Sequence, residues 1–280
     1  MGALMAAPVA GLSDAALRDR VAQATTLYFT DWAHPVSGMA RERTGGDVGY
    51  DIHETVCTGG TGFGIMAQIV AAERGWRPAR DIEDRVRRIA GYLETADRFE
   101  GVYPHFLHGT TGKALEIFPG DDGGDIVETA FLMMGLLCAS QYYRASAPDL
   151  SARLVALYEG VDWTAHQRGG EIMWQRSPNR PWPANALAVR GWNEAMVLFP
   201  LACGSPTHPL PAAIHNDSWA KAEQFLNGRS FGGIPLPLGP DWGGPLFLSQ
   251  YSFLGLDPRG LVGGGVDYHA HVRAHAAVNR

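Results

Sequence analysis

Two kinds of predicted helix alternate along this chain, and the alternation restricts the fold more than any other sequence feature. One kind is apolar on every side, and the other carries apolar residues on one face and charges on the opposite face. The apolar helices are predicted at residues 58–75, 125–144, 191–204 and 239–254, and the amphipathic ones between them at 81–98, 149–163 and 212–226. Because a helix that is apolar all round must be buried, the pattern predicts an inner ring of helices wrapped by an outer ring.

We therefore predict an all-α fold, an (α/α)6 toroid with short β-hairpins in its loops, the clearest of them at 102–118. No alternation of strand and helix suggests a parallel sheet. With further helices at 13–32 and 267–280, the chain provides about nine of the twelve helices that such a ring contains. No Gly, Pro or capping residue ends the last helix, so we expect a fragment that lacks its final helices. Residues 1–11 are expected to be a disordered leader, and 12–280 the toroid domain.

Composition excludes several classes of partner. The 280 residues carry a formal net charge of −6 and no Lys/Arg-rich run, which argues against nucleic-acid binding. No segment is long and apolar enough to span a membrane. Residues 1–11 lack the regions of a signal peptide, so the protein as written is cytoplasmic, or periplasmic or secreted if residues precede Met1. The 3 cysteines lie far apart and predict no disulfide framework. The oligomeric state stays open.

Two motifs that could suggest a metal or a cofactor are incomplete. His271 and His275 have the spacing of a helical zinc pair, but no HExxH motif is formed and no third ligand is evident. Residues 58–64 are rich in glycine, but no strand precedes them and no Lys-Ser/Thr follows. The sequence therefore predicts neither a metal site nor a cofactor.

Three carboxylates stand where apolar helices begin. Asp125 and Glu128 follow a glycine-rich acidic loop, and their spacing fits a capping box, which satisfies free N–H groups of the first turn. The same spacing also places both carboxylates on one face, where they could perform acid–base chemistry. Glu194 is either a partner of the helix dipole or a catalytic acid. The inner helices should run parallel, so the loops at their N-terminal ends would bring the three carboxylates to one funnel.

Aromatic residues in the same loops favour a carbohydrate ligand. Sugar C–H faces pack on aromatic rings, and paired carboxylates can cleave a glycosidic bond. The residues expected at the funnel mouth are Tyr103, His105, Phe106, Trp192 and Trp242. Trp192 and Trp174 could equally fill the core.

Five segments resemble the glucoamylase-like domain family, in the same order and over nearly the whole chain: residues 124–132, 192–196, 204–209, 237–247 and 251–259. The Asp125-x-x-Glu128 form most resembles the β-1,2-glucanase branch, glycoside hydrolase family 144. This resemblance implies an (α/α)6 barrel and inverting, metal-independent hydrolysis of β-1,2-glucan. It also implies that family members continue past the point that matches Arg280, where another cleft carboxylate could lie.

The resemblance assigns expected roles to individual residues. Glu194 is the leading candidate for the acid, with Asp125 and Glu128 in the cleft, binding substrate or positioning water. The expected substrate contacts are Tyr103, His105, Phe106, Trp174, Trp192, Asn193, His208, Trp242 and Arg43.

We thus predict a glycoside hydrolase that binds an oligosaccharide or polysaccharide glucan and cleaves it by endo action. Two alternatives are a non-catalytic glycan-binding protein and a toroid-fold polysaccharide lyase. The acidic funnel disfavours the lyase, because polyanionic substrates need cationic clefts.

Overall fold

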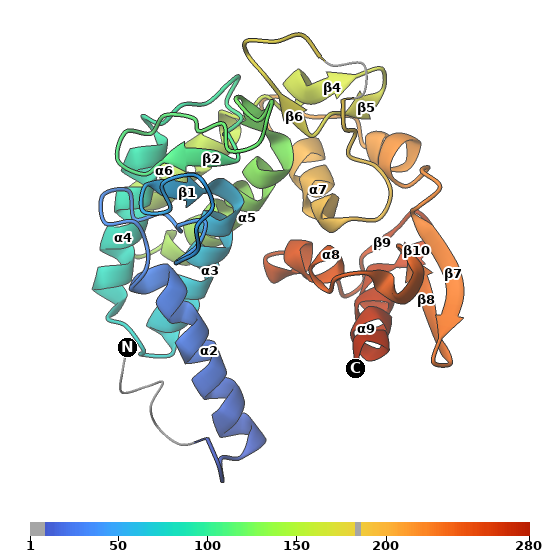
Figure 1. Cartoon of the computed structure of the whole chain (residues 1–280), viewed down its shortest axis with the longest axis horizontal. Coiled ribbons are helices and arrows are strands. Elements are labelled where there is room, and N and C mark those ends of the chain that lie inside the picture. Colours follow the sequence, from blue (N-terminus) through green and yellow to red (C-terminus); the bar gives the residue numbers. More distant parts are fainter. Residues whose placement is uncertain (1–8, 183–185) are drawn as a thin grey trace.

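The structure, a computed structural model, describes residues 9–182 and 186–280, which form an open arc of helices joined by long loops and short hairpins (Figure 1). The predicted leader at 1–11 falls mostly on residues 1–8, outside the described residues. The α-helices are α2 (Asp14–Thr30), α3 (Thr58–Glu73), α4 (Ala79–Leu93), α5 (Ile126–Tyr143), α6 (Pro148–Glu159), α7 (Leu198–Cys203), α8 (Phe247–Gln250) and α9 (Tyr268–Asn279). Within the described ranges, no helix combines the length and the apolar character that crossing a bilayer requires.

The backbones of α3 and α5 touch at the centre of the N-terminal half. A Cβ atom on Gly62 would lie 2.1 Å from the carbonyl oxygen of Phe131, and one on Gly135 would lie 2.2 Å from the carbonyl oxygen of Gly62. Only glycine permits such an approach. The first half of α5 is buried except at Glu128. This close packing explains why both helices are apolar on every side, and it confirms the predicted inner layer.

The amphipathic helices lie outside this pair. α4 and α6 each bury one apolar stripe, which consists of Ile82, Val86, Ile89 and Leu93 on α4 and of Leu150, Leu154 and Leu157 on α6. Figure 1 shows α4 at the outer edge of the arc, with α3 and α5 nearer its middle. The two layers confirm the predicted fold class, a partial (α/α)6 toroid.

Short helices of other types complete the path of the chain. They are η1 (Trp163–His166), η2 (Glu194–Val197), the π-helical turn η3 (His215–Trp219), η4 (Asp241–Gly243) and η5 (Tyr251–Leu254). η2 runs directly into α7, so the predicted helix at 191–204 begins three residues late, with Asn193 as its N-cap.

Each sheet in the described residues has two antiparallel strands. The pairs are β1 (Thr55–Cys57) with β2 (Phe106–His108), β3 (Gly124–Asp125) with β6 (Gln175–Arg176), β4 (Gln167–Arg168) with β5 (Glu171–Ile172), β7 (Leu226–Phe231) with β8 (Ile234–Leu238), and β9 (Val262–Gly263) with β10 (Val266–Asp267). The hairpin expected at 102–118 is reduced to one bridge between Leu107 and Ala114, since β2 pairs mainly with β1.

The helix predicted at 212–226 is wrong. Only η3 forms there, and the chain then turns and enters β7. Ile214 and Trp219 are both buried at a spacing of five residues, which a π-helical turn places on one side and an α-helix does not. The indole of Trp219 packs between Phe199 and Phe225, with ring centroids 4.9 and 5.1 Å away. Tertiary packing of these rings therefore overrides the local helical pattern.

Candidate active site

The N-terminus of α5 positions the first two carboxylates. One oxygen of Asp125, Oδ1, accepts hydrogen bonds from the backbone N–H groups of Val127 and Glu128, at 3.0 and 2.9 Å. Asp125 therefore caps the helix, as the sequence suggested. Its other oxygen, Oδ2, is buried and has no hydrogen-bond partner. A cap needs only one oxygen, so the second is available for another role.

Glu128 does not complete a capping box. A capping box would have Glu128 accept from the backbone N–H of Asp125, but that N–H donates to the carbonyl of Tyr103. Glu128 Oε2 instead accepts from the backbone N–H of Gly59 at 2.8 Å and lies 3.5 Å from the thiol of Cys57. The carboxylate thus reaches across to the start of α3, which fixes its position.

His105 stands among three carboxylates. Its Nδ1 lies 3.6 Å from Oδ2 of both Asp121 and Asp125, and its Nε2 lies 3.7 Å from Oε1 of Glu128. The two aspartates are buried, whereas about a quarter of the His105 side chain is exposed. The imidazole therefore separates a buried acidic pair from the solvent-facing side of the site.

Burial sets the protonation of the two aspartates. It raises the pKa of Asp121 to about 6, with the charge of His105 opposing and that of Glu128 adding to the effect. Burial likewise raises the pKa of Asp125 well above its usual range, and the charge of Glu128 raises it further. Neither oxygen of Asp121 has a hydrogen-bond partner. Near neutral pH, Asp121 is ionised yet basic enough to take up a proton, which is the property of a general base.

Glu194 comes from the other half of the chain. It opens η2, where the side chain of Asn193 accepts from the N–H of Ala195 at 3.0 Å. Ser252 holds this turn on both sides: its hydroxyl donates to the carbonyl of Glu194 at 2.6 Å and accepts from the N–H of Val197 at 2.9 Å. The backbone that carries the Glu194 carboxyl is therefore fixed by η5.

The surroundings of Glu194 raise the pKa of its carboxyl group above the usual value. Burial raises its pKa, a backbone hydrogen bond opposes this, and the charge of Glu128 raises the pKa further. The effect of Glu128 is an electrostatic interaction between the two carboxyl groups across the site. A carboxyl that keeps its proton near neutral pH can serve as a general acid.

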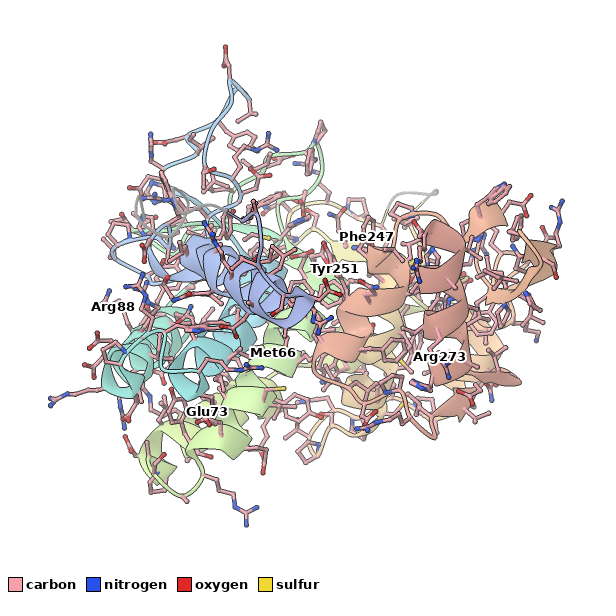
Figure 2. The ribbon with its side chains drawn as sticks, turned by 90° about the horizontal axis from the view of Figure 1, so that it is seen from below. Met66, Glu73, Arg88, Phe247, Tyr251 and Arg273 are labelled. Atoms are coloured by element: carbon pink, nitrogen blue, oxygen red, sulfur yellow. The ribbon has the colours of Figure 1, made fainter. Side chains whose placement is uncertain are left out.

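Aromatic rings line the same region. Phe106 stacks on His105, with ring centroids 3.9 Å apart and planes at 13°. Phe118 is 56% exposed and lies 5.9 Å from Phe106 between centroids, so its face is open to a ligand. Tyr251 packs on Phe63 at 4.7 Å and joins η5 to α3 (Figure 2). Burial and the charges of Glu128 and Glu194 raise the pKa of Tyr251.

Two expected substrate contacts, Tyr103 and Trp192, are corrected by the structure. Tyr103 is fully buried and donates its hydroxyl to the carbonyl of Leu93, so it is a core residue. Trp192 is 5% exposed, stacks on Tyr268 and donates its Nε1–H to Ser249 at 3.3 Å. His208 is exposed but follows the end of α7 opposite to Glu194. Burial removes Tyr103 and Trp192 from the substrate, whereas a substrate contact of His208 stays a prediction.

The remaining expected contacts have distinct surroundings. Trp174 is half-buried beside Asp125, because its carbonyl accepts from the N–H of Ile126. Arg43 is partly exposed and donates to Glu42 at 2.8 Å. Asn193 serves as the cap of η2.

Trp242 is 60% exposed, and its ring packs on Phe231 at 4.9 Å. It lies in η4, which contacts both strands of the β7–β8 hairpin. Its role as a sugar platform stays a prediction.

Known proteins resemble this chain closely. A family model described as "Putative glucoamylase" matches residues 186–280. A solved structure from Bacteroides fragilis with the same description is 42% identical, with a TM-score of 0.89, and the match covers 98% of this chain and 67% of that one. The chain belongs to the glucoamylase-like family.

Two other relatives of this glucoamylase-like chain have more specific names. An endo-β-1,2-glucanase from Chitinophaga pinensis, solved with sophorotriose and glucose, has a TM-score of 0.91 and 39% identity over 96% of this chain and 66% of its own. An exo β-1,2-glucooligosaccharide sophorohydrolase from Parabacteroides distasonis is 33% identical over 96% of this chain. The glucoamylase-like chain spans 40% of the length of that sophorohydrolase.

Sequence reasoning missed several residues of this glucoamylase-like site. Asp121 lies in the acidic loop that the sequence singled out, but the loop as a whole gave no reason to select one of its aspartates. The sequence shows that Asp121 belongs to an acidic loop, but it does not show that this side chain is buried. Cys57, Phe118 and Tyr251 were not singled out, because only the fold brings them to Glu128, His105 and Phe131, respectively.

Two sets of side chains in the described residues have the spacing of metal ligands. One consists of His105, Asp121 and Asp125, and the other of Cys57, His105 and Glu128, with the ligand atoms of each set within 4.8 Å of one another. His271 and His275 face a different partner: both contact the hydroxyl oxygen of Ser249, at 2.8 and 2.6 Å.

Proposed function

We propose that this protein is a glycoside hydrolase that cleaves β-1,2-linked glucan by an inverting mechanism. The observation that carries the proposal is the group of carboxyl groups around His105, in which Asp121 and Asp125 hold buried oxygens without a hydrogen-bond partner. Buried carboxylates of this kind cost stability, and such costs are typical of catalytic sites. The names of the β-1,2-glucan relatives support the substrate class.

The environments of the carboxyl groups suggest a division of roles. Glu194, whose pKa burial raises, is the acid that donates a proton to the leaving glycosidic oxygen. Asp121 takes the proton of the attacking water by way of His105, whose Nδ1 lies 3.6 Å from Asp121, while Asp125 and Glu128 hold the imidazole in place. As the bond from the anomeric carbon to the leaving oxygen breaks, the water oxygen bonds to that carbon from the opposite face, so the product has inverted configuration.

Substrate binding would use the open aromatic faces near the carboxylates. Phe118 is exposed and Phe106 lies beside His105, so sugar rings can pack between them and the polar groups. Endo action is favoured by the higher identity to the endo-acting relative, 39% against 33% for the exo-acting one. The partner is accordingly a glucan chain rather than a short disaccharide alone.

Digestion of linear β-1,2-glucan tests the proposal. We expect a series of β-1,2-glucooligosaccharides by chromatography, because an endo enzyme cuts within the chain, and NMR of the first products should show the α-anomer. Release of only disaccharide would point to exo action. Glucan that binds without being cleaved would favour the non-catalytic alternative, and unsaturated products would favour the lyase.

A further inference from the structure

A thiol, an imidazole and a carboxylate meet at the solvent-facing side of the site. Cys57 ends β1, His105 immediately precedes β2, and Glu128 lies in the first turn of α5. The Cys57 Sγ is 3.5 Å from Glu128 Oε2, and the His105 Nε2 is 3.7 Å from Glu128 Oε1. One ligand atom from each of the three residues lies within 4.8 Å of the other two. The proposed hydrolysis makes no use of the thiol.

We propose that Cys57, His105 and Glu128 bind a zinc ion, and that zinc bound there inhibits the enzyme. The binding site stands on the geometry of these three residues. The inhibition rests on the proposed function, because it requires that His105 and Glu128 take part in hydrolysis.

The separations of the donor atoms suit tetrahedral zinc. With Zn–S of about 2.3 Å and Zn–N and Zn–O of about 2.0–2.1 Å, tetrahedral angles place S and O about 3.5 Å apart and N and O about 3.3 Å apart. The observed distances, 3.5 Å from Sγ to Oε2 and 3.7 Å from Nε2 to Oε1, are close to these values but run to different oxygens of Glu128. Zinc would therefore be bound through both oxygens, or the carboxylate would turn to bring one oxygen to the ion. A set of one thiolate, one imidazole and one carboxylate also suits zinc better than Mg²⁺ or Ca²⁺, which prefer oxygen ligands only.

The two buried aspartates prepare the histidine. A zinc-bound histidine almost always has a hydrogen-bond acceptor, often a carboxylate, at its other ring nitrogen, and this fixes the tautomer. Here Asp121 and Asp125 both lie 3.6 Å from Nδ1 of His105. Their Oδ2 oxygens have no other hydrogen-bond partner and can accept from an Nδ1–H group, which leaves the lone pair of Nε2 free to bind the metal on the side of Glu128.

Zinc binding is a simple exchange of a proton for a metal. Burial and the charge of Glu128 raise the pKa of the Cys57 thiol, so the metal-free protein holds the S–H proton. On binding, that proton leaves to solvent and the sulfur bonds to zinc, with no oxidation or reduction. The ion can enter because His105 and Glu128 are partly exposed, with 25% and 17% of their side chains accessible. Once bound, it occupies the two groups that the hydrolysis needs.

Metal titration tests the binding site directly. Protein freed of metal by a chelator is titrated with Zn²⁺ against a chromophoric competitor, and separately with Co²⁺, whose absorption reveals a thiolate ligand. We expect one equivalent to bind with a thiolate–cobalt band. The Cys57→Ser variant should lose the band and bind Zn²⁺ at least about a hundredfold more weakly, since even outer-shell changes cost 10–100-fold.

Cys138→Ser is the matched control, because Cys138 is also a free cysteine but lies in α5 against Gly255. It should bind Zn²⁺ as the parent does. Equal zinc affinity in the parent and in Cys57→Ser, or no thiolate band in the parent, would overturn the site.

Inhibition is measured on each variant relative to its own metal-free turnover of β-1,2-glucan. Zn²⁺ should inhibit the parent and Cys138→Ser at least tenfold more strongly than Cys57→Ser. Zinc bound through Cys57 without loss of turnover would overturn the inhibitory role. An absence of turnover in the metal-free parent would contradict the proposed hydrolysis instead, while the titrations would still decide the site.

Discussion

At the scale of single residues, the site contains charges that the fold does not neutralise. Asp121 is 2% exposed and has no hydrogen-bond partner, whereas its neighbour Asp122 accepts from Asn179 and Arg180 at 3.2 and 3.4 Å. Two adjacent aspartates in one loop therefore have opposite effects on stability. An uncompensated buried carboxylate is destabilising, so its presence indicates that the position serves chemistry rather than folding.

The Asp121→Asn variant should be more stable than the parent at pH 7. Because the folded-state pKa is raised from 3.8 to about 6, the parent loses stability as pH rises through this window. A shift of about two units corresponds to about 3 kcal/mol. We expect Asn to recover up to that amount at pH 7 and nothing below about pH 4, as measured by urea unfolding across this range. Turnover should fall at least about a hundredfold if Asp121 is the base.

Asp122→Asn provides the control for this experiment. Although burial opposes it, hydrogen bonds from Ser177 and Asn179 and the charge of Arg180 hold the pKa of Asp122 below its usual value. Its stabilisation is present at neutral pH and is lost as pH falls through the lowered folded-state pKa. Asp122→Asn should therefore be less stable than the parent at pH 7. A gain in stability at pH 7 in both variants, or in neither, would show that burial does not determine the effect of Asp121 on stability.

Glu194→Gln tests the acid. Gln keeps the shape and hydrogen bonding of the side chain but cannot donate the proton, so kcat on β-1,2-glucan should fall at least about a hundredfold. KM should change little, because the turn stays fixed by Ser252. Steady-state kinetics of the purified variant would measure both. Turnover above a tenth of the parent's would assign the acid role to another residue.

At the scale of elements, glycine determines how closely the two inner helices pack. A side chain at Gly62 would clash with the backbone of α5, whereas one at Gly60, two residues earlier on α3, would meet only Cys57 and Ala40 at 3.4 and 4.0 Å. The glycine cluster at 58–64 permits close packing of this helix. The structure identifies the glycine at which the packing is tightest.

The pair Gly62→Ala and Gly60→Ala should separate packing from helix propensity. Gly62→Ala forces α3 away from α5 and should destabilise the protein by about 3 kcal/mol or more. Gly60→Ala should be neutral or stabilise it by up to about 1 kcal/mol, because alanine favours the helix. Thermal or urea unfolding of both variants measures the difference. Similar stabilities for the two would contradict the close contact between the helices.

At the scale of the whole molecule, the site lies where two halves of the chain meet. Asp121, Asp125 and Glu128 come from the N-terminal half, and Glu194 comes from the C-terminal half. Tyr251 joins these halves, because its ring contacts Phe63 on α3 and Phe131 on α5, at 4.7 and 5.8 Å. Figure 2 shows Tyr251 between the two groups of helices. The geometry of the site therefore depends on this contact.

Tyr251→Ala should weaken both the fold and the site. The side chain is about one-third exposed, so its truncation should cost about 1–3 kcal/mol, less than for a fully buried ring. Tyr251→Phe keeps the ring contacts and should retain stability to within about 0.5 kcal/mol. Unfolding experiments compare the two. If Phe is as destabilising as Ala, the hydroxyl and not the ring holds the halves together.

The sequence alone determined the features that depend on neighbouring residues. Apolar periodicity predicted the helices and their two layers, and local side-chain chemistry predicted the cap at Asp125, which accepts from backbone N–H groups of its helix. The motifs at 124–132 and 192–196 indicated the family and three of the carboxyl groups in the site. Periodicity failed at 212–226, where ring packing decided the conformation.

Only the tertiary structure decided which side chains are buried and which charges lie close together. Tyr103 and Trp192 have aromatic rings that could pack on a sugar, yet the fold buries both side chains in the core. Asp121, Cys57 and Tyr251 come from separate loops and helices, and their contacts with His105, Glu128 and Phe63 join residues distant in the chain. Burial and Coulomb energy depend on distances through space, and these follow from how the helices pack rather than from any local pattern.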